Sequence, residues 1–501
     1  MSINDDLFDR FEALTFDDVV VIPGFSETLP DEVDTTATFA GDIELAVPLV
    51  SAAMDKVTEG RMAIAMARYG GIGVIHRNMS IADQASEVQK VKRSQSGMIT
   101  DPVTLPPTAL LHEAEALMHR FKFSGVPITD DEGHLVGILT NRDIRFCEGT
   151  DFDRPVTDFM TSDRLVTAAV GTSLDEAKLL LQEHRIEKLP LVDGVGCLAG
   201  LITVKDIQKR LDFPNASRDG KGRLRCAAAI GVGADVEERV DALVSMGVDA
   251  VSIDTAHGHS ANVIKTIERV KGSWPELAVT AGNVVTEDGV EALAKAGADA
   301  VKVGVGAGSI CTTRVVSGAG MPQLSAIYFA SKRAKEMGIP IIGDGGITFS
   351  GDIVKAITAG AETVMLGSLL AGVEESPGEM ELFEGRRYKS YRGMGSMGAM
   401  TGDSQDRYAT GQSSSSKSAV GAASQKLVPE GIEGRVPFSG PLGDVAYQLV
   451  GGLRSGMGYA GAATLAQLRS AKIMRVTTAG RQESHPHDVT ITKEAPNYQR
   501  T

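Results

Sequence analysis

Short apolar runs that end in a polar residue or a glycine recur along most of the chain. After an extended lead-in at 14–23, eight of them are found: Val47–Asp55, Gly71–His76, Cys226–Gly231, Ala250–Asp254, Leu277–Gly282, Ala300–Val303, Pro340–Asp344 and Thr363–Gly367. Segments of helical periodicity separate them, for example Ile81–Arg93, Val236–Met246 and Gly289–Ala296. Such runs are typical of strands that are buried on both faces. Their alternation with helices predicts an α/β fold, a TIM (β/α)8 barrel.

The pattern changes between the second and third runs. Thr104, Gly137, Thr140 and Asp143 each recur 63 residues later, as Thr167, Gly200, Thr203 and Asp206. Self-similarity at one period indicates a duplicated unit, which we interpret as strand, helix, strand, strand and helix. We therefore predict a first barrel segment, an inserted pair of repeats (98–157 and 158–215) and a second barrel segment, at 1–96, 97–215 and 216–501.

Composition restricts the class of protein. A chain of 501 residues with 43% hydrophobic and 23% charged residues is expected to form two or more globular domains. The net charge of −15 argues against a nucleic-acid partner, and no apolar run approaches the roughly 20 residues of a membrane span. The acidic start lacks the basic residues of a signal peptide, and the four scattered cysteines predict reduced thiols in a cytoplasmic protein.

Polar and glycine-rich motifs follow the predicted strands, where TIM barrels carry their chemistry. Gly345, Gly346, Gly367 and Ser368 follow the last two strands, the usual place of a phosphate site in such barrels. The alternative is that these glycines only serve tight turns. Asp344 ends the seventh strand, where its carboxylate could accept hydrogen bonds from ribose hydroxyls or could cap a helix.

The loop from Gly304 to Arg314 is the strongest candidate for catalysis. It carries glycines at 304, 306 and 308 and a single thiol, Cys311, followed by Thr312 and Thr313. A thiol on a glycine-rich loop after a strand is well placed to act as a nucleophile. The alternative is a buried free cysteine, because cysteine also packs as a small hydrophobic residue.

The segment Gly308-Ser-Ile-Cys-Thr-Thr-Arg314 resembles the active-site loop of the IMP dehydrogenase and GMP reductase family, and the similarity extends from about Leu14 to Tyr498. The Gly-(Ile/Leu)-(Leu/Ile)-Thr-x-x-Asp signature of the two repeats resembles a tandem CBS pair, or Bateman module. The resemblance implies IMP as substrate and NAD as cofactor. It implies IMP contacts from Met54, Ser309, Asp344, Gly345, Gly346, Gly367, Ser368, Tyr391, Gly393, Met394, Gly395 and Glu430.

The same resemblance implies the chemistry. Cys311 would attack the purine of IMP, hydride would pass to NAD⁺, and water would hydrolyse the covalent intermediate to XMP. NAD contacts are implied for Asp254, Asn283, Gly304 and Gly306. Arg407 with Tyr408 is implied as the base that activates water, with Thr313 and Glu430 as an alternative relay. Arg407, Tyr408 and Glu430 belong to a segment at about 401–435 that resembles a mobile flap. The Ser-rich middle of this segment would by composition alone indicate disorder.

Two further sites follow from the resemblance. A potassium ion would be held by backbone carbonyls of Gly304, Gly306 and Cys311 together with Glu483, Ser484 and His485 of a neighbouring subunit, in a homotetramer or an octamer. In the CBS pair, Thr140, Asp143, Thr203 and Asp206 stand at strand-to-helix junctions that could hold a purine nucleotide such as ATP or GTP.

Three competing interpretations are open at this point. Gly393-Met-Gly-Ser-Met-Gly398 matches G-x-G-x-x-G, but a polar stretch precedes it and no βαβ unit surrounds it, which argues against a Rossmann site. GMP reductase shares the cysteine loop and the barrel, although the flap and Arg407 argue against it. A nucleotide-sensing or filament-forming protein led by the CBS pair is the third interpretation.

Overall fold

The computed structural model describes residues 12–94, 102–121, 123–400, 428–493 and 495–498. The chain divides into two compact units. The larger unit comprises Met1–Ser94, Asn215–Asp219 and Leu224–Thr501, and the smaller comprises Gln95–Pro214 and Gly220–Arg223. Arg407 and Tyr408 lie outside the described residues.

The larger unit is a closed barrel of eight parallel strands, as the sequence predicts. In order around the barrel they are β11 (Ala227–Ile230), β12 (Ala250–Asp254), β13 (Ala278–Val284), β14 (Ala300–Val303), β15 (Ile341–Asp344), β16 (Thr363–Leu366), β4 (Leu49–Ser51) and β5 (Ile72–Ile75). Each predicted run contributes one strand. Closure is made by β16, which pairs with β4 in the register Leu366 to Ser51.

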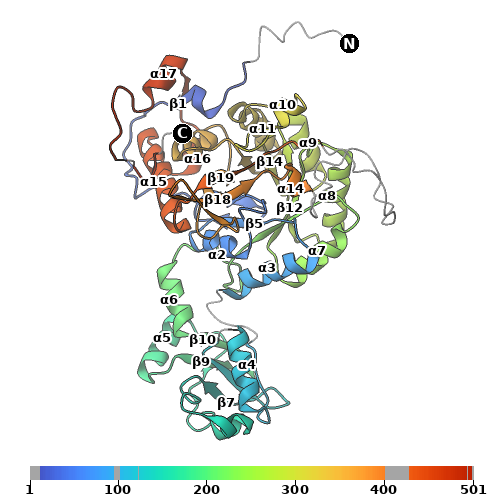
Figure 1. The fold of residues 1–501 in the computed structure, drawn as a ribbon, viewed down its shortest axis with the longest axis vertical. Helices are drawn as coiled ribbons and strands as arrows, with labels where there is room; N and C mark the ends of the chain where they lie inside the picture. Colours follow the sequence, from blue (N-terminus) through green and yellow to red (C-terminus); the bar gives the residue numbers. More distant parts are fainter. Residues whose placement is uncertain (1–11, 95–101, 122, 401–427, 494, 499–501) are drawn as a thin grey trace. The chain divides into compact units, whose positions relative to one another are not determined.

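Helices surround the strands (Figure 1). They are α2 (Gly60–Arg68), α3 (Ile81–Ser94), α7 (Val236–Ser245), α8 (Ala261–Ser273), α9 (Glu287–Lys295), α11 (Gln323–Met337) and α12 (Ser350–Thr358). Each buries an apolar stripe on the barrel, such as Val236, Val240 and Leu243 of α7. α15 (Leu442–Ala460) packs against α12 and α2, the place of an eighth helix, because α13 (Ser368–Ala371) is short. No helix in the described part of the chain is long and apolar enough to span a membrane.

Small side chains line the barrel interior. Ala250, Ala278 and Ala300, the first residues of three strands, are buried against Phe39 and Ile43 of a hairpin formed by β2 (Ala37–Ala40) and β3 (Ile43–Leu45). The hairpin therefore fills the barrel at the amino-terminal ends of its strands. The carboxyl-terminal ends are left for polar side chains, as in other TIM barrels.

A three-stranded antiparallel sheet stands beside the barrel. It consists of β17 (Met380–Phe383), β18 (Arg386–Arg392) and β19 (Glu433–Pro437). The polar stretch before Gly393 is thus a strand, contrary to the sequence interpretation. The sheet is antiparallel and α14 (Met397–Met400) is short, so the G-x-G-x-x-G match has no βαβ unit around it and is not a Rossmann site.

The lead-in segment is not wholly extended. Phe16–Asp18 forms a 3-10 turn, in which the N–H of Thr15 donates to Asp18 Oδ2 at 2.7 Å. β1 (Val19–Val21) then pairs antiparallel with β20 (Ile473–Arg475), so both ends of the unit are joined. The unit is completed by α10 (Thr313–Val316), α16 (Leu465–Leu468) and α17 (Thr478–Glu483).

The smaller unit contains both repeats. The first has α4 (Leu111–Phe121), β6 (Gly125–Thr129), β7 (Leu135–Thr140) and the 3-10 turns Gly149–Asp153 and Val156–Asp158. The second has β8 (Ala168–Ala169), α5 (Leu174–Glu183), β9 (Lys188–Val192), β10 (Leu198–Thr203) and α6 (Val204–Asp212). The helix predicted after Thr140 is not formed: residues 141–146 are a turn, whereas the counterpart segment of the second repeat is the helix α6.

The segment that returns from the insert is part of the barrel unit. The N–H of Ser217 donates to the carbonyl of Ala67 at 2.8 Å. Lys92, in the last turn of α3, is buried with its Nζ 2.5 Å from Asp249 and 3.3 Å from Asp219. Burial raises the pKa of Asp249, an effect that the Lys92 ammonium opposes. The junction is thus held by a buried ion pair that includes the return segment.

We expect the insert to be removable only up to this segment. A chain that lacks 95–214, with a short Gly-Ser linker in its place, should unfold in urea like a stable barrel. A chain that lacks 97–221 also loses Asp219 and the Ser217 contact, and should be less stable by about 1–3 kcal/mol. Asp219→Asn in the first deletion isolates the ion-pair part. Equal stability of both deletions would show that the return segment does not matter.

Candidate active site

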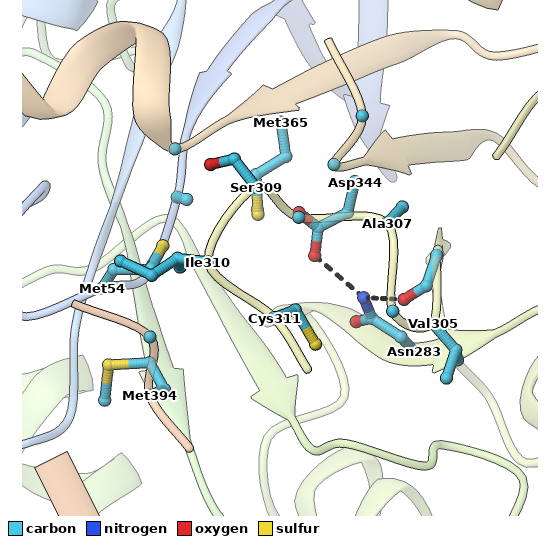
Figure 2. A pocket seen from close by; sticks show the side chains of 18 of the residues that line it. Met54, Asn283, Val305, Ala307, Ser309, Ile310, Cys311, Asp344, Met365 and Met394 are labelled. Carbon is cyan, nitrogen blue, oxygen red and sulfur yellow. Dashed lines mark hydrogen bonds between the residues drawn. The ribbon is translucent and has the colours of Figure 1, made fainter. Parts of the chain in front are cut away.

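One cavity of about 260 Å³ opens at the carboxyl-terminal ends of the barrel strands. Figure 2 shows Cys311 beside Asn283 and Ile310, with Met54 and Met394 on another wall. The lining contains all twelve residues for which IMP contact was inferred, as well as Cys311, Thr313, Asp254, Asn283, Gly304 and Gly306. Residues that are more than 300 positions apart in the sequence, such as Met54 and Glu430, therefore meet around the thiol.

The thiol of Cys311 lies between two oxygen atoms. Its Sγ is 3.1 Å from Thr313 Oγ1 and 3.7 Å from the carbonyl oxygen of Glu430. Cys311 is partly exposed, whereas Cys226 is buried in the core. The packing alternative that the sequence left open therefore applies to Cys226 and not to Cys311.

The cysteine loop is tied to the segment that follows residue 428. The N–H of Thr312 donates to the Glu430 carbonyl and that of Ile432 to the Ile310 carbonyl, each at 3.0 Å. The N–H of Glu430 in turn donates to the Gly395 carbonyl at 3.0 Å. The cysteine loop, the 430–432 segment and the Gly393–Gly395 loop are therefore one hydrogen-bonded layer over the barrel end.

Glycines in the cysteine loop let the chain pack against itself. Gly304 and Gly306 have φ values of 147° and 74°. A Cβ at Gly304 would lie 2.1 Å from the Asp344 carbonyl oxygen, and one at Gly306 would lie 2.4 Å from Arg314 Cγ. Arg314 crosses beneath the loop, where its Nε donates to the Val305 carbonyl at 3.1 Å. These glycines thus admit Arg314 and the neighbouring strand end.

Lys302 is a central residue that the sequence analysis missed. Its side chain is 1% exposed, and its Nζ lies 3.0 Å from Asp254 Oδ1 and 2.9 Å from Asp344 Oδ2, and also bonds Asn283 Oδ1. One ammonium therefore joins the ends of β12, β13 and β15 from inside the barrel. The signal was present as a lysine in the apolar run Ala300-Val-Lys-Val303, since an unpaired lysine does not stay buried.

Asp344 is oriented by this network. Its Oδ2 also accepts a hydrogen bond from Asn283 Nδ2 at 2.9 Å, and the same amide nitrogen donates to the Gly304 carbonyl at 2.6 Å (Figure 2). The side chain stays 21% exposed at the cavity. Its partners are side chains and not the backbone of a helix, so Asp344 is not a capping aspartate.

The two glycine loops after β15 and β16 face the cavity with free donors. The N–H groups of Gly346 and Ser368 donate to no acceptor among the residues that the structure describes. A Cβ at Gly367 would lie 3.1 Å from Tyr391 Oη and 3.2 Å from Met54 Sδ, so the absence of a side chain at Gly367 lets these two residues pack closely against its backbone. Free N–H groups around a space suit an anion.

Tyr391 lines the cavity beside the loop that follows β16. It is 6% exposed, and its Oη lies 3.7 Å from Met54 Sδ. Burial raises the pKa of its phenol to about 12, an effect that a hydrogen bond with Ser309 opposes. The phenol is therefore neutral at any working pH and can act there as a hydrogen-bond donor or acceptor.

A second cavity, of about 230 Å³, lies within the smaller unit and draws on both repeats. Thr140, Arg142 and Asp143 line it from the first repeat, and Glu187 and Lys188 from the second. The N–H and hydroxyl of Thr140 both donate to Asp143 Oδ2 at 2.7 Å. The lining does not include Thr203 or Asp206, and Asp206 is buried against Thr203. The two repeats are therefore not equivalent in this structure.

The residues inferred for potassium fall into two places. The carbonyls of Gly306 and Cys311 accept no hydrogen bond from the described residues, whereas that of Gly304 accepts one from Asn283. Glu483, Ser484 and His485 lie at the end of α17, where His485 Nδ1 is 3.2 Å from Tyr498 Oη. They do not line the cavity of the same chain, as expected if a neighbouring subunit supplies them.

Asp130, Glu132 and His134 form a further cluster that could hold a metal ion. It lies in the turn between β6 and β7. Asp130 Oδ1 accepts the backbone N–H groups of Glu132 and His134 at 3.1 and 2.8 Å. These bonds explain the cluster as a turn that Asp130 stabilises.

Comparison with known proteins identifies a family. A sequence model described as "IMP dehydrogenase / GMP reductase domain" matches residues 13–487. Curated proteins named inosine-5'-monophosphate dehydrogenase match along almost the whole chain. That of Aquifex aeolicus is 57% identical over 97% of this chain and 98% of its own length. That of Bacillus subtilis is 55% identical over the same shares.

A solved structure is similar as well. It is a cysteine-to-alanine variant of GMP reductase from Trypanosoma brucei in complex with guanosine 5'-monophosphate. The TM-score is 0.87 at 38% identity, and the match covers 97% of this chain and 100% of the other.

Replacement of Lys302 tests the central network. Lys302→Met leaves the Asp254 and Asp344 carboxylates together without a cation, and we expect it to lower the free energy of unfolding by about 3 kcal/mol at pH 7. Protonation of either carboxylate removes the repulsion between them. The loss should therefore shrink as pH falls and the carboxyls bind protons.

Lys389→Met is the matched control. Lys389 is also buried, but its Nζ bonds backbone carbonyls, including that of Val373 at 3.0 Å. The loss in free energy of unfolding caused by Lys389→Met should not shrink as pH falls. Urea unfolding at pH 5 and 7 compares the two variants. If the loss in free energy of unfolding caused by Lys302→Met is the same at pH 5 and pH 7, the proposed charge balance is contradicted.

Proposed function

The chain belongs to the IMP dehydrogenase and GMP reductase family, and we propose that it oxidises IMP to XMP with NAD⁺, in guanine nucleotide synthesis. The observation that carries the proposal is the position of Cys311, on a loop above the barrel and in one cavity with the free N–H groups of Gly346 and Ser368. A nucleotide whose phosphate lies at those groups can present its base to the thiol.

The first half of the reaction is an attack by Cys311. The thiolate adds to C2 of the hypoxanthine ring, hydride leaves from C2, and a thioimidate remains on the sulfur. Thr313 Oγ1, 3.1 Å from Sγ, is close enough to hydrogen-bond the thiolate. Asp344 accepts hydrogen bonds from the ribose hydroxyls, because Lys302 and Asn283 hold its carboxylate at the cavity. Gly345 and Gly367 complete the phosphate loops.

The base of the nucleotide lies between the cysteine loop and the second wall. Ser309 and Tyr391, together with Met54, border that space. Gly393, Met394 and Gly395 follow Tyr391 and present backbone groups to the purine. Glu430, whose backbone is tied to Thr312 and Gly395, brings its carboxylate to the same cavity.

The residues present suit NAD. Asp254 and Asn283 end adjacent strands at the cavity, and Gly304 and Gly306 follow on the next loop. When bound, NAD⁺ supplies the hydride acceptor. Asp254 offers a carboxylate to ribose hydroxyls, and its charge is balanced by Lys302, so it needs no second cation from the ligand.

The second half of the reaction needs a water molecule and a base. By the family resemblance we assign that base to Arg407, with Tyr408 beside it, on the flap at about 401–435. The alternative relay runs from Thr313 to Glu430. It is supported by the short distance from Thr313 Oγ1 to Cys311 Sγ and by a carboxylate's ordinary capacity as a base.

Three further properties belong to the proposal. Potassium would be held by the carbonyls of Gly304, Gly306 and Cys311 with those of the neighbouring subunit's Glu483, Ser484 and His485; the free carbonyls of Gly306 and Cys311 support this. The enzyme would act as a homotetramer or an octamer. Its place would be the cytoplasm, in keeping with four free cysteines.

The regulatory part of the proposal concerns the smaller unit. We assign a purine nucleotide, ATP or GTP, to the cavity of Thr140 and Asp143. Arg142, Arg164 and Lys188 line it and give it the charge that phosphates need. Burial lowers the pKa of Lys188, so a phosphate there would favour its charged form. Thr203 and Asp206 would serve an equivalent site of the second repeat.

GMP reductase is the second candidate, supported by the structural match. The curated relatives at 55–57% identity, each named inosine-5'-monophosphate dehydrogenase, favour IMP oxidation. A reductase releases ammonia and requires no base to activate water. NADH formation from IMP, compared with NADPH consumption with GMP, distinguishes the two.

Two variants test the division of the reaction. Cys311→Ala should form no NADH from IMP while it binds IMP with nearly unchanged affinity. Arg407→Ala should give a rapid burst of NADH, followed by steady turnover that is roughly 10²–10⁴-fold slower. Stopped-flow absorbance measures the burst, and intact-protein mass detects IMP on Cys311. A Cys311→Ala enzyme that still forms NADH would overturn the mechanism, and so would an Arg407→Ala enzyme that loses burst and turnover equally.

Nucleotide binding to the smaller unit is tested by calorimetry with ATP and GTP. Asp143→Ala frees Thr140 from its hydrogen bonds and should weaken binding about tenfold. Asp130→Asn, in the turn of the same unit, is the matched control and should bind normally. If neither ATP nor GTP produces heat of binding, the ligand assignment is wrong. If Asp143→Ala and Asp130→Asn lose nucleotide affinity equally, the site assignment is wrong.

A further inference from the structure

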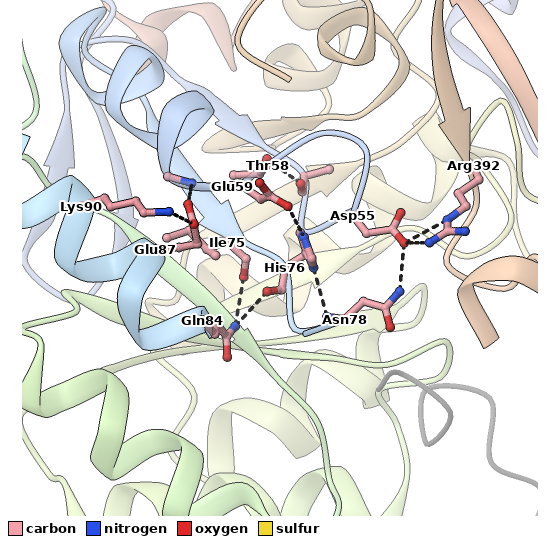
Figure 3. A network of polar contacts seen from close by, with 12 residues as sticks. Asp55, Thr58, Glu59, Ile75, His76, Asn78, Gln84, Glu87, Lys90 and Arg392 are labelled. Carbon is pink, nitrogen blue, oxygen red and sulfur yellow. Dashed lines mark hydrogen bonds and ion pairs between the residues drawn. The ribbon is translucent and has the colours of Figure 1, made fainter. Parts of the chain in front are cut away.

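A charged contact joins the barrel to the sheet of β17, β18 and β19. Arg392, the last residue of β18, donates to Asp55 Oδ2 from Nε at 2.9 Å and from a terminal nitrogen at 2.5 Å. Asp55 follows the end of β4. Figure 3 shows the two bonds converging on this carboxylate, with Asn78 approaching from the side of β5.

The two partners stand directly beside residues of the cavity. Met54 precedes Asp55, and Tyr391 and Gly393 flank Arg392. Met54 Sδ and Tyr391 Oη are in contact at 3.7 Å. The ion pair is thus one residue away from the contact by which β18 packs on the end of β4, and it fixes the position of the chain on both sides of that contact.

Asp55 depends strongly on its partners. It is 7% exposed, and its Oδ2 accepts two hydrogen bonds from Arg392 and one from Asn78 Nδ2, the last at 2.9 Å. Oδ1 is buried and has no hydrogen-bond partner among the described residues. A buried carboxylate with one unbonded oxygen is costly unless a cation balances it, and Arg392 supplies that charge.

Asn78 is itself held in place. Its N–H donates to His76 Nδ1 at 3.0 Å, which leaves the ring proton on Nε2, 3.3 Å from Glu59 Oε1. The contact therefore runs from Glu59 before α2, through His76 and Asn78, to Asp55 (Figure 3). This side of the joint is anchored in the barrel.

On its other side Arg392 faces Glu433 of β19. The hydrogen bond that Arg392 donates to Asp55, with the charges of Asp55 and Glu433, raises the pKa of Arg392 against the effect of burial. Glu433 Oε1 accepts the N–H of Gly398 at 2.7 Å. Glu433 follows the 430–432 segment, which bonds the Cys311 loop. Arg392 thus lies between the barrel and the layer that carries the thiol.

We propose that Asp55 and Arg392 are a positioning pair that sets affinity for the nucleotide substrate by holding Tyr391 and the Gly393–Gly395 loop against Met54. The proposal rests on the function proposed above, because it takes the nucleotide base to lie against the wall formed by Met54, Tyr391 and the Gly393–Gly395 loop. Asp254 and Asn283, which serve NAD, lie on the strands that Lys302 joins, so the pair should affect IMP much more than NAD.

The test measures IMP affinity by calorimetry, which requires no turnover. Arg392→Met should weaken IMP binding about tenfold, while the KM for NAD changes less than about twofold. Arg392→Lys should recover only part of the loss, since an ammonium lacks the two-pronged geometry of a guanidinium. In the double variant Asp55→Asn, Arg392→Met the losses should not add, because both changes remove one interaction.

Arg469→Met is the matched control. The Arg469 side chain is 28% exposed and pairs with Glu362, compared with 25% for Arg392, and neither residue lines the cavity. Arg469→Met should leave the affinity for IMP unchanged, while its thermal stability should be similar to that of Arg392→Met. Should Arg392→Met fail to fold, Asp55→Asn, which keeps the shape of the side chain, decides the matter.

Three results would overturn the pair's role: unchanged IMP affinity in the Arg392 and Asp55 variants, the same loss in Arg469→Met, or equal factors for IMP and NAD. Failure of the proposed function has another signature. A parent enzyme that binds IMP but forms no NADH would refute the reaction and leave the positioning role of Asp55 and Arg392 intact.

Discussion

The site depends on one buried ammonium group. Lys302 reaches Asp254, Asn283 and Asp344 from inside the barrel, so three strand ends cannot move independently. Two carboxylates can both stay ionised side by side in a protein interior only when a cation offsets their repulsion. The ammonium is therefore a condition for placing acceptors for sugar hydroxyls beside a reactive thiol, and the geometry of the cavity follows from it.

Strands and their ends were predictable because burial on both faces leaves a continuous apolar signal. Every predicted barrel run became a strand, and the inferred IMP contacts line one cavity. The bonds among the cysteine loop, Glu430 and Gly395 were not predictable from local pattern, because they join backbone groups that are distant in the sequence. Lys302 was missed because apolar neighbours masked a residue whose partners lie on three other segments.

Other differences have local causes. β18 is rich in polar residues because it belongs to a small sheet with much exposed surface, so a search for apolar runs does not detect it. The helix expected after Thr140 is replaced by a turn, because the equal spacing of Thr and Asp in the two repeats does not by itself fix the conformation of the residues that follow. The glycines at 304 and 306 were expected to contact NAD and potassium, and they also admit groups of the chain itself, the Asp344 carbonyl and the side chain of Arg314.

The closure of the barrel has a consequence for synthesis of the chain. β4 pairs with β16. The edge of β4 at Leu49 therefore stays without its partner strand until Val364 has been synthesised. The insert, a contiguous stretch between them, has its own hydrophobic clusters and needs no later residue beyond the return of the chain. Domains fold as units in order of synthesis, and distant pairings form slowly. On the ribosome the insert should thus be complete while β4 and β5 have only each other as partners and their outer edges are still unpaired, the stage at which a nascent chain is most exposed to aggregation.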